Sequence, residues 1–170
     1  MSEFEAVMDA LREEFGDQVV DSIEFRGQLT AFVQPEAIVE ACGFLKDRGF
    51  NLLIALTAAD FWPEEPRFEI VYKFYSTELN ELIGLSVRLD GEEPKVPSID
   101  AVYPNANWHE REVFDMFGID FSGSSDLRRI LMPYDWEGHP LRRDYPLGYE
   151  EVQFTFNYDE IDKRKKYAKD

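Results

Sequence analysis

Two neighbouring segments of the chain, residues 68–74 and 83–89, place a large apolar side chain at every second position. Successive side chains of a β-strand point to opposite faces of a sheet. This period therefore predicts two strands that bury one face and leave the other open. The alternating residues are Phe68, Ile70, Tyr72, Phe74, Ile83, Leu85, Val87 and Leu89. Any fold of this chain must cover one face of a sheet.

Helical spacing of apolar residues predicts two helices in the first fifty residues. The first covers residues 2–15, where Ser2 and Glu5 have the spacing of a capping box. The second begins at Pro35, which suits a first helical position, and carries Cys42 on its apolar stripe. We expect this lone thiol to be a buried structural side chain and not a reactive one.

Three more strands complete the predicted sheet. Residues 19–26 and 28–33 form a hairpin that turns at Gly27, and the apolar run at residues 51–60 is typical of a central strand. The order of elements is α-β-β-α-β-β-β. It predicts an α+β fold class, a two-layer domain with helices on one face of a mixed, roughly five-stranded sheet.

Beyond residue 90 the strand period ends, because Gly91, Pro94 and Pro97 interrupt it. The sequence predicts a short helical turn near residues 98–102. A helix from about residue 105 to 117 follows, with Asn105 or Asn107 as its N-cap.

Residues 117–150 show no sustained period. This stretch of 34 residues holds four glycines and three prolines but also six aromatic residues. It is too apolar for a flexible linker and too long for an ordinary loop. Ordering it costs on the order of 35–70 kcal/mol, which burial of the aromatic residues must offset. We therefore expect residues 117–158 to wrap along another subunit, and we divide the chain into a globular domain (1–117), a partner-wrapping segment (118–158) and a charged tail (159–170).

The charge of the chain excludes several classes of partner. Asp and Glu outnumber Lys and Arg by 35 to 18, and residues 1–100 alone carry 21 acids and 8 bases, a net of −13. This balance argues against binding to nucleic acid or to anionic lipid. One cysteine excludes an internal disulfide and an iron–sulfur cluster with the usual four thiolates. With no signal peptide and no long apolar run, we expect a soluble, cytoplasmic protein.

A possible metal or acid–base site lies at His109 and Glu112, which share a helix face at i, i+3. With His139 they define one hypothesis, a stand-alone metal-dependent hydrolase. A charged helix surface with an intrahelical pair such as Arg111–Asp115 is the simpler interpretation. In a further alternative, carboxylates flanking Arg111 join the Arg128-Arg129 pair in a buried network that fixes the exit of the following segment. A regulatory binding module is the remaining hypothesis.

Residues 110–147 carry three longer motifs, ERExFDMFGI, LRRIL and WEGHPLRRDY. They closely resemble the signature of the C-subunit (30-kDa) family of proton-pumping NADH:quinone oxidoreductase, respiratory complex I. Members usually have His-Pro where this chain has Ser124-Ser125, and this departure puts in doubt any role of that histidine. The equivalent subunit of a complex I-like membrane-bound hydrogenase or of a photosynthetic NDH-1 complex is the alternative assembly.

The resemblance implies a non-catalytic structural subunit of the peripheral arm, on the cytoplasmic side of the bacterial inner membrane. It would dock on the D subunit of the complex, with the B, G and I subunits as possible neighbours. The chain itself would hold no cofactor, since FMN and the iron–sulfur clusters would lie in partner subunits and NADH and quinone would be substrates of the whole complex. The implied signature and interface residues are Glu110, Arg111, Glu112, Asp115, Gly118, Leu127, Arg128, Arg129, Trp136, Gly138, His139, Pro140, Arg142, Arg143, Asp144 and Tyr145.

Overall fold

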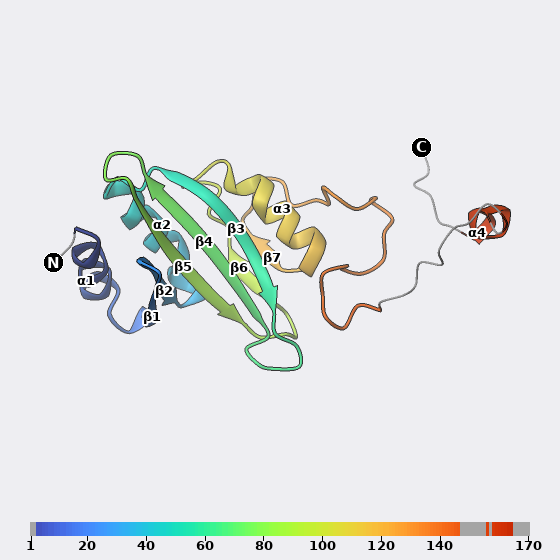
Figure 1. Ribbon diagram of the computed structural model, residues 1–170, viewed down its shortest axis with the longest axis horizontal. Coiled ribbons are helices and arrows are strands. Elements are labelled where there is room, and N and C mark those ends of the chain that lie inside the picture. Colours follow the sequence, from blue (N-terminus) through green and yellow to red (C-terminus); the bar gives the residue numbers. More distant parts are fainter. Residues whose placement is uncertain (1–2, 147–155, 157, 165–170) are drawn as a thin grey trace.

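A five-stranded sheet organises the computed structural model, which describes residues 3–146, 156 and 158–164 (Figure 1). The strands follow the spatial order β1-β2-β5-β4-β3. The elements are α1 (Glu3–Phe15), η1 (Gly16–Gln18), β1 (Val19–Phe25), β2 (Gln28–Val33), η2 (Pro35–Ala37), α2 (Ile38–Asp47), β3 (Leu52–Asp60), β4 (Phe68–Ser76), β5 (Glu81–Leu89), β6 (Lys95–Pro97), α3 (Ala106–Phe117), β7 (Asp120–Ser122) and α4 (Tyr158–Arg164).

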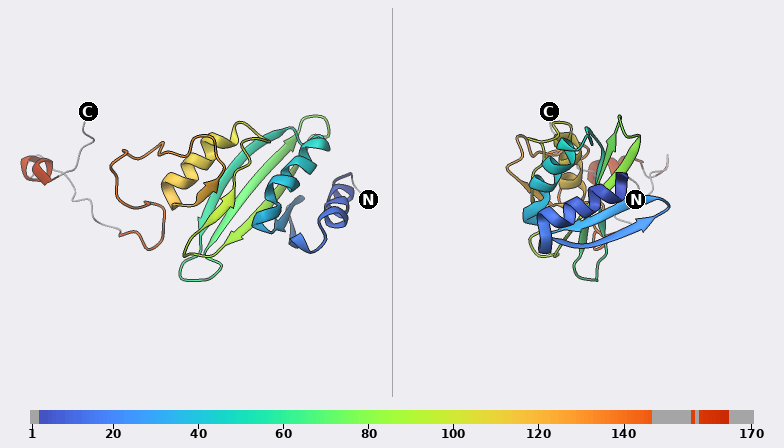
Figure 2. Two further views of the ribbon diagram at one scale, coloured as in Figure 1. Left: turned by 180° about the vertical axis from the view of Figure 1, so that it is seen from behind. Right: turned by 90° about the vertical axis from the view of Figure 1, so that its left-hand side faces the viewer.

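The sheet is mixed because β2 and β5 pair in parallel, whereas the other neighbouring strands pair antiparallel. Helices α2 and α3 lie on the same side of it, and the opposite face is left uncovered by them (Figure 2). The predicted fold class, a two-layer α+β domain with a mixed five-stranded sheet, is confirmed.

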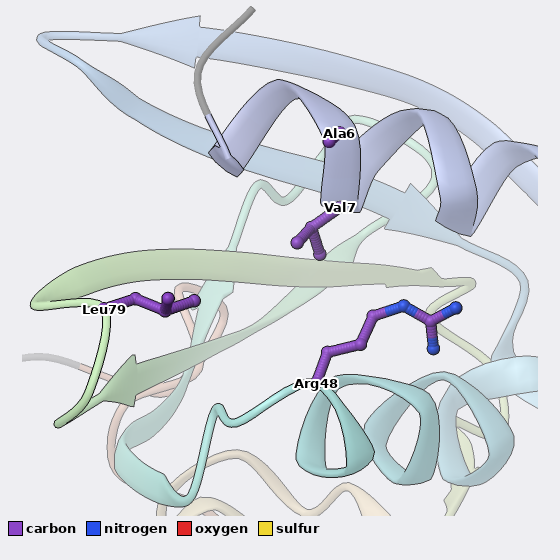
Figure 3. Close-up of a pocket in the computed structure, with 4 residues that line it drawn as sticks. All are labelled: Ala6, Val7, Arg48 and Leu79. Carbon is purple, nitrogen blue, oxygen red and sulfur yellow. The ribbon is translucent and has the colours of Figure 1, made fainter.

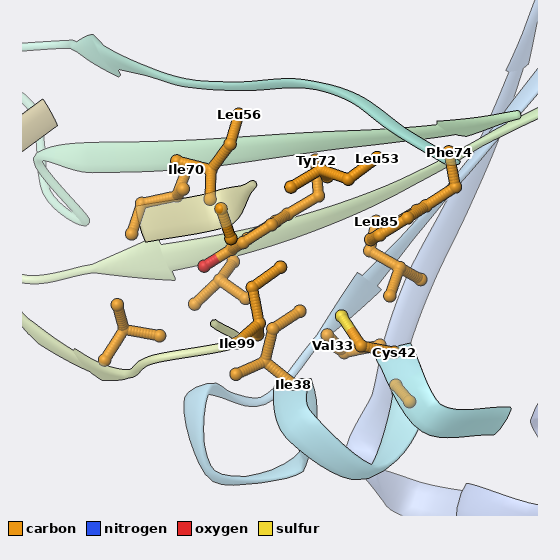
Figure 4. Close-up of a cluster of buried hydrophobic side chains, with 14 of the residues drawn as sticks. Val33, Ile38, Cys42, Leu53, Leu56, Ile70, Tyr72, Phe74, Leu85 and Ile99 are labelled. Carbon is orange, nitrogen blue, oxygen red and sulfur yellow. The ribbon is translucent and has the colours of Figure 1, made fainter. Parts of the chain in front are cut away.

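The covered face of the sheet forms the core (Figure 4). The large side chains of β4 on this face, from Phe68 to Phe74, are completely buried, and so are those of β5 from Ile83 to Val87. Cys42 of α2 packs among them with no exposed surface. Burial raises the pKa of its thiol, so the expected inert, buried cysteine is confirmed.

Local backbone conformation explains the predicted turn at Gly27 and the predicted helix start at Pro35. Arg26 and Gly27 have φ values of 53° and 73°, so the β1–β2 hairpin turns through two left-handed residues as the right-handed strand twist favours. Pro35 begins a single 3-10 turn, and α2 follows directly at Ile38. Ser2, the predicted cap of α1, lies outside the described residues.

The prediction of a central strand at residues 51–60 was wrong, because β3 lies at the edge of the sheet. Its outward residues Leu52 and Ile54 are 46% and 47% exposed. An apolar run does not reveal strand order. That order depends on the parallel pairing of β2 with β5, which brings β5 and β4 between β2 and β3.

In the region after β5, the predicted turn and the predicted helix at about residues 105–117 are both confirmed, whereas a short strand pair was missed. The turn near residues 98–102 is present, since Tyr103 N–H donates to the Ile99 carbonyl. The short parallel pair β6–β7 was missed, because three residues are too few to show a period. Asn105 stands at the N-cap position of α3 as predicted, but its side chain forms no capping hydrogen bond. It donates instead to the Leu53 carbonyl (2.8 Å), and Asn107, the other predicted cap, lies inside α3 and donates to Ser125.

Candidate functional site

Asp115 is a fully buried carboxylate on α3 and organises the chain that follows this helix. Its Oδ2 accepts hydrogen bonds from three consecutive backbone N–H groups, those of Ile130, Leu131 and Met132, at 2.8–3.0 Å. Its Oδ1 accepts one from the Arg129 guanidinium at 2.6 Å. Burial by itself would raise the pKa of Asp115, but these donors outweigh it and hold the pKa below the usual range.

Arg129 extends this arrangement to the next turn of the segment. Its Nη2 donates to the carbonyls of Trp136 and Gly138, both at 3.0 Å. One guanidinium therefore joins α3 to two stretches of irregular chain. A planar group with five donors suits such a junction better than a lysine.

Arg111, one turn earlier on α3, holds the entry of the same segment. It donates through Nε to the Arg128 carbonyl (3.1 Å) and through Nη2 to the Arg129 carbonyl (3.2 Å), and its guanidinium lies over the Trp108 ring. Asp115 pairs with Arg129, so the predicted intrahelical pair with Arg111 was wrong.

Glu110 faces the opposite way, into the β6 side of the domain. It is fully buried and accepts hydrogen bonds from Ser98 Oγ (2.7 Å) and Ile99 N–H (2.8 Å). Burial raises its pKa. Glu112, by contrast, is exposed on the outer side of α3.

A second junction ties the end of the segment to the tip of the sheet. Arg67 forms two-pronged ion pairs with both Asp60 (2.8 and 2.9 Å) and Asp144 (2.7 and 3.0 Å). Asp60 also accepts from the backbone N–H groups of Arg143 and Trp62. Burial opposes ionisation of Asp60, yet the hydrogen bonds from Arg67 and these amides lower its pKa to about 2.

Arg142 and Gly118 form the third junction, at the C-terminal end of α3. Arg142 Nε donates to the Phe117 carbonyl (2.5 Å), and its guanidinium lies over the ring of Phe68. Gly118 ends the helix at φ 70°, where a Cβ would meet the ring of His139 at 2.5 Å. Only glycine satisfies both the left-handed backbone and this close approach.

His139 is positioned by the same helix end. Its Nδ1 lies 3.0 Å from the Asp115 carbonyl, which accepts a hydrogen bond from the imidazole. Burial lowers its pKa, which favours the neutral ring. The next contact along the chain places the Tyr145 ring 2.9 Å from where a Cβ of Gly138 would stand. These contacts give the segment one defined path over the helix.

The remaining signature residues differ in exposure. Leu127 packs against the core, Pro140 is half-buried, and the buried indole Nε1 of Trp136 has no hydrogen-bond partner in the described part of the chain. The Arg128 side chain is 72% exposed and pairs with Asp126. Arg143 is exposed too, and donates to the Trp62 carbonyl at 3.3 Å.

The outer surface of residues 127–146 carries apolar side chains together with charges of both signs. Leu131, Tyr134 and Leu141 are 61%, 73% and 54% exposed, and the exposed charged residues are Arg128, Asp135, Glu137, Arg143 and Asp144. Aromatic residues and arginine are enriched at the centres of protein interfaces. The segment is thus held from within by buried polar contacts and presents a surface suited to a protein partner.

The metal hypothesis receives no support from the positions of its residues. Across residues 3–146, 156 and 158–164, no three His, Cys, Asp or Glu side chains are grouped to hold a metal ion. Residues His109 and Glu112 lie on α3, whereas the His139 ring contacts Phe114 and the Asp115 carbonyl. The three do not converge.

A shallow depression at the far end of the domain also lacks convergent polar groups (Figure 3). Ala6, Val7, Arg48 and Leu79 line it, and the Arg48 guanidinium lies over the ring of Phe44. No helix in the described part of the chain is long and apolar enough to cross a membrane.

The described geometry defines an α+β domain on which buried polar contacts hold an irregular segment, residues 118–146. Residues 31–151 match the model of the family "Respiratory-chain NADH dehydrogenase, 30 Kd subunit". The chain is 50% identical over 167 residues to the C subunit of the NADH-quinone oxidoreductase of Roseiflexus sp. (strain RS-1), covering 96% of both chains. It is 48% identical to that of Rhodobacter capsulatus, covering 88% of this chain and 74% of the relative. The chain therefore belongs to the 30-kDa subunit family of respiratory-chain NADH dehydrogenase.

Solved structures agree with this assignment. The trypsin-resistant fragment (1–134) of Nqo5 superposes with a TM-score of 0.64 at 28% identity, covering 72% of this chain and 98% of the fragment. A chain of an archaeal membrane-bound sulfane sulfur reductase superposes with a TM-score of 0.74 at 23% identity, covering 99% and 97%. The second likeness concerns the fold alone.

The sequence motifs singled out most of the residues that meet at α3, but they missed those at the sheet tip. Asp60 and Arg67 lie at the ends of two strands, on either side of a turn with Pro63 and Pro66. The only signal was a pair of opposite charges flanking that turn. Their third partner, Asp144, lies 77 residues further along the chain.

Proposed function

We propose that this chain is the C subunit of an NADH:quinone oxidoreductase and acts as a structural member of its peripheral arm. The identity of 50% over 96% of both chains supports the assignment. In this proposal the whole complex transfers electrons from NADH to quinone, with FMN and the iron–sulfur clusters in partner subunits. The single, fully buried Cys42 is consistent with a chain that ligates no cluster. Attachment to the cytoplasmic side of the membrane would come through the complex.

Docking takes place on the D subunit, with the B, G and I subunits as further neighbours. The observation that carries this proposal is the segment 118–146, whose buried contacts to Asp115 and Arg67 leave Leu131, Leu141 and Arg128 facing outward. A surface that is ordered before binding loses less conformational entropy on association. The partner then meets a rigid surface of apolar side chains and arginines that is less acidic than residues 1–100.

The test is assembly in the native cell with an affinity tag on this chain. The wild-type chain should co-purify with the D subunit in equal amounts and with NADH:quinone oxidoreductase activity. The double variant Leu131→Glu, Leu141→Glu changes two exposed side chains and should lose at least nine-tenths of both. Arg12→Glu on α1 changes the net charge by the same −2 and should assemble normally.

Three outcomes would overturn the proposal. Full co-purification of the double variant would show that this surface is not used. Recovery of hydrogenase or sulfur reductase subunits with the wild-type chain would instead identify a related complex I-like assembly. One chain of a membrane-bound sulfane sulfur reductase has the same fold as this chain. Purification without any subunit of either kind would favour an independent binding module.

A further inference from the structure

The sheet face opposite the core is a surface whose role the segment 118–146 does not explain. Strand pairing places on it the residues that alternate with the buried ones, and Figure 1 views the sheet from this side. We call it the open face. It comprises Asp21, Ile23 and Phe25 of β1, Gln28, Thr30 and Phe32 of β2, Leu82, Gly84, Ser86 and Arg88 of β5, Glu69, Val71, Lys73 and Tyr75 of β4, and Leu52, Ala55, Thr57 and Ala59 of β3.

Lys73 lies flat across the middle of this face. Its Nζ donates to Thr30 Oγ1 at 3.0 Å, although β5 lies between the two strands. The crossing is possible because the intervening residue is Gly84, where an added Cβ would stand 2.8 Å from Nζ and 2.6 Å from Thr30 Oγ1. The ammonium group is therefore held at a fixed point, on a stem laid against the sheet.

Glu69 and Arg88, two other charged residues of the open face, already have partners on it. Glu69 accepts from Ser86 Oγ at 2.8 Å and lies 3.4 Å from Arg88 Nε. The Arg88 guanidinium in turn lies over the ring of Phe32. The hydrogen-bond partner of Lys73 is the uncharged hydroxyl of Thr30, and within the described residues Lys73 forms no ion pair. Burial lowers its pKa, as expected for an ammonium group without a nearby carboxylate.

Apolar side chains flank this cation on both sides. Ile23 and Phe25 on β1 are 48% and 66% exposed, and Leu52 on β3 is 46% exposed. Val71 and Tyr75 stand beside Lys73 on its own strand and are half-buried. A sheet face that merely meets water normally carries polar residues at these alternating positions.

We propose that the open face docks a neighbouring protein subunit of the assembly, which places an Asp or Glu carboxylate on Lys73 within a ring of apolar contacts. The inference rests on the proposed function, since it presumes an assembly. Charge complementarity favours this partner. The chain carries a net charge of −17 and repels acidic surfaces elsewhere, whereas Lys73 is the one cation on this face without an anion among the described residues. A carboxylate brought there gains an ion pair that is shielded from water.

Lysine acylation provides the first test, with the chain free and in the purified complex. Lys73 should react in the free chain and at least tenfold more slowly in the complex. Lys95, whose side chain is 63% exposed and which pairs with Asp120, provides the reference rate within the same sample. Equal reactivity of Lys73 in both samples would overturn the inference while leaving docking through the segment 118–146 intact.

Substitution provides the second test. Lys73→Met keeps an apolar stem and removes the charge, and Lys73→Glu reverses it; each should lower incorporation into the complex, the second at least tenfold. Lys95→Glu is the matched control and should incorporate normally. The urea midpoint of each free variant separates misfolding from lost docking. If wild type assembles and a folded Lys73→Glu chain assembles equally well, this inference fails alone; if wild type itself does not assemble, the proposed function fails first.

Discussion

The substitution Asp115→Asn should loosen the segment 118–146 from its domain. The buried Asp115 carboxylate accepts four hydrogen bonds, three from backbone amides and one from Arg129. An amide side chain removes the charge and turns an NH2 group toward at least one of these donors. The Arg129 guanidinium then keeps no anionic partner at this junction.

The expected cost is that of removing one partner from a buried ion pair, about 3–5 kcal/mol. Each hydrogen bond to a charged acceptor contributes about 1.5–3 kcal/mol, so a loss of two such bonds falls in the same range. This is a large fraction of the roughly 5–15 kcal/mol that stabilise an ordinary domain.

The assay is urea unfolding of the isolated chain, with the Asp115→Asn variant compared with wild type. Glu112→Gln changes an exposed carboxylate on the same helix and should alter the free energy of unfolding by less than about 0.5 kcal/mol. If both variants unfold at the wild-type urea concentration, Asp115 does not hold the segment, and the reasoning is refuted.

Two further predictions concern the helix end and the sheet tip. Gly118→Ala should destabilise the chain by about 1–3 kcal/mol, because it places a Cβ at φ 70° against His139. Gly43→Ala inside α2 meets open space and should stabilise the chain by about 0.5–1 kcal/mol. Thermal unfolding compares the two variants, and equal midpoints would contradict the argument. Because Asp60 has a pKa of about 2 in the folded chain and about 3.9 when unfolded, its contribution of about 2–3 kcal/mol is complete above about pH 5 and is lost as the pH falls through 2. The Asp60→Asn variant should show a shallower loss of unfolding free energy over that range, and an unchanged slope would contradict the assignment.

The periodic parts of the chain could be predicted and their arrangement could not. Alternation revealed β4 and β5 because each buries one face, and helical spacing with Pro35 revealed α2. The parallel pairing of β2 with β5 depends on contacts between residues more than fifty positions apart, so it left no local signal. For the same reason the apolar run of β3 was misplaced at the centre of the sheet.

The site was predicted in its residues but not in their contacts. We expected Arg129, Arg142 and Asp144 to bind a partner subunit, and the structure gives each of them an acceptor or donor within this chain. Most of the acceptors of the two arginines are backbone carbonyls, which every residue has and no motif distinguishes. Ordering residues 117–150 costs conformational entropy, which favourable contacts must offset. Part of that offset comes from hydrogen bonds to Asp115 and Arg67 of the domain itself.

Which partner surrounds the segment and how the chain is divided into domains stay predictions. β7 lies beyond the predicted boundary at residue 117 and pairs with β6 of the globular part. Helix α4, from Tyr158 to Arg164, begins one residue before the predicted charged tail, and residues 147–155 of the wrapping segment lie outside the described residues.

Hydrogen exchange on the isolated wild-type chain tests the central claim, that the segment 118–146 is ordered on its own domain before any partner binds. The account predicts that the amides of Ile130, Leu131 and Met132, which donate to Asp115, exchange at least a hundredfold more slowly than unprotected amides, and that Asp115→Asn abolishes this protection. Exchange of these three amides at the unprotected rate in the free chain, with protection only in the assembled complex, would contradict it.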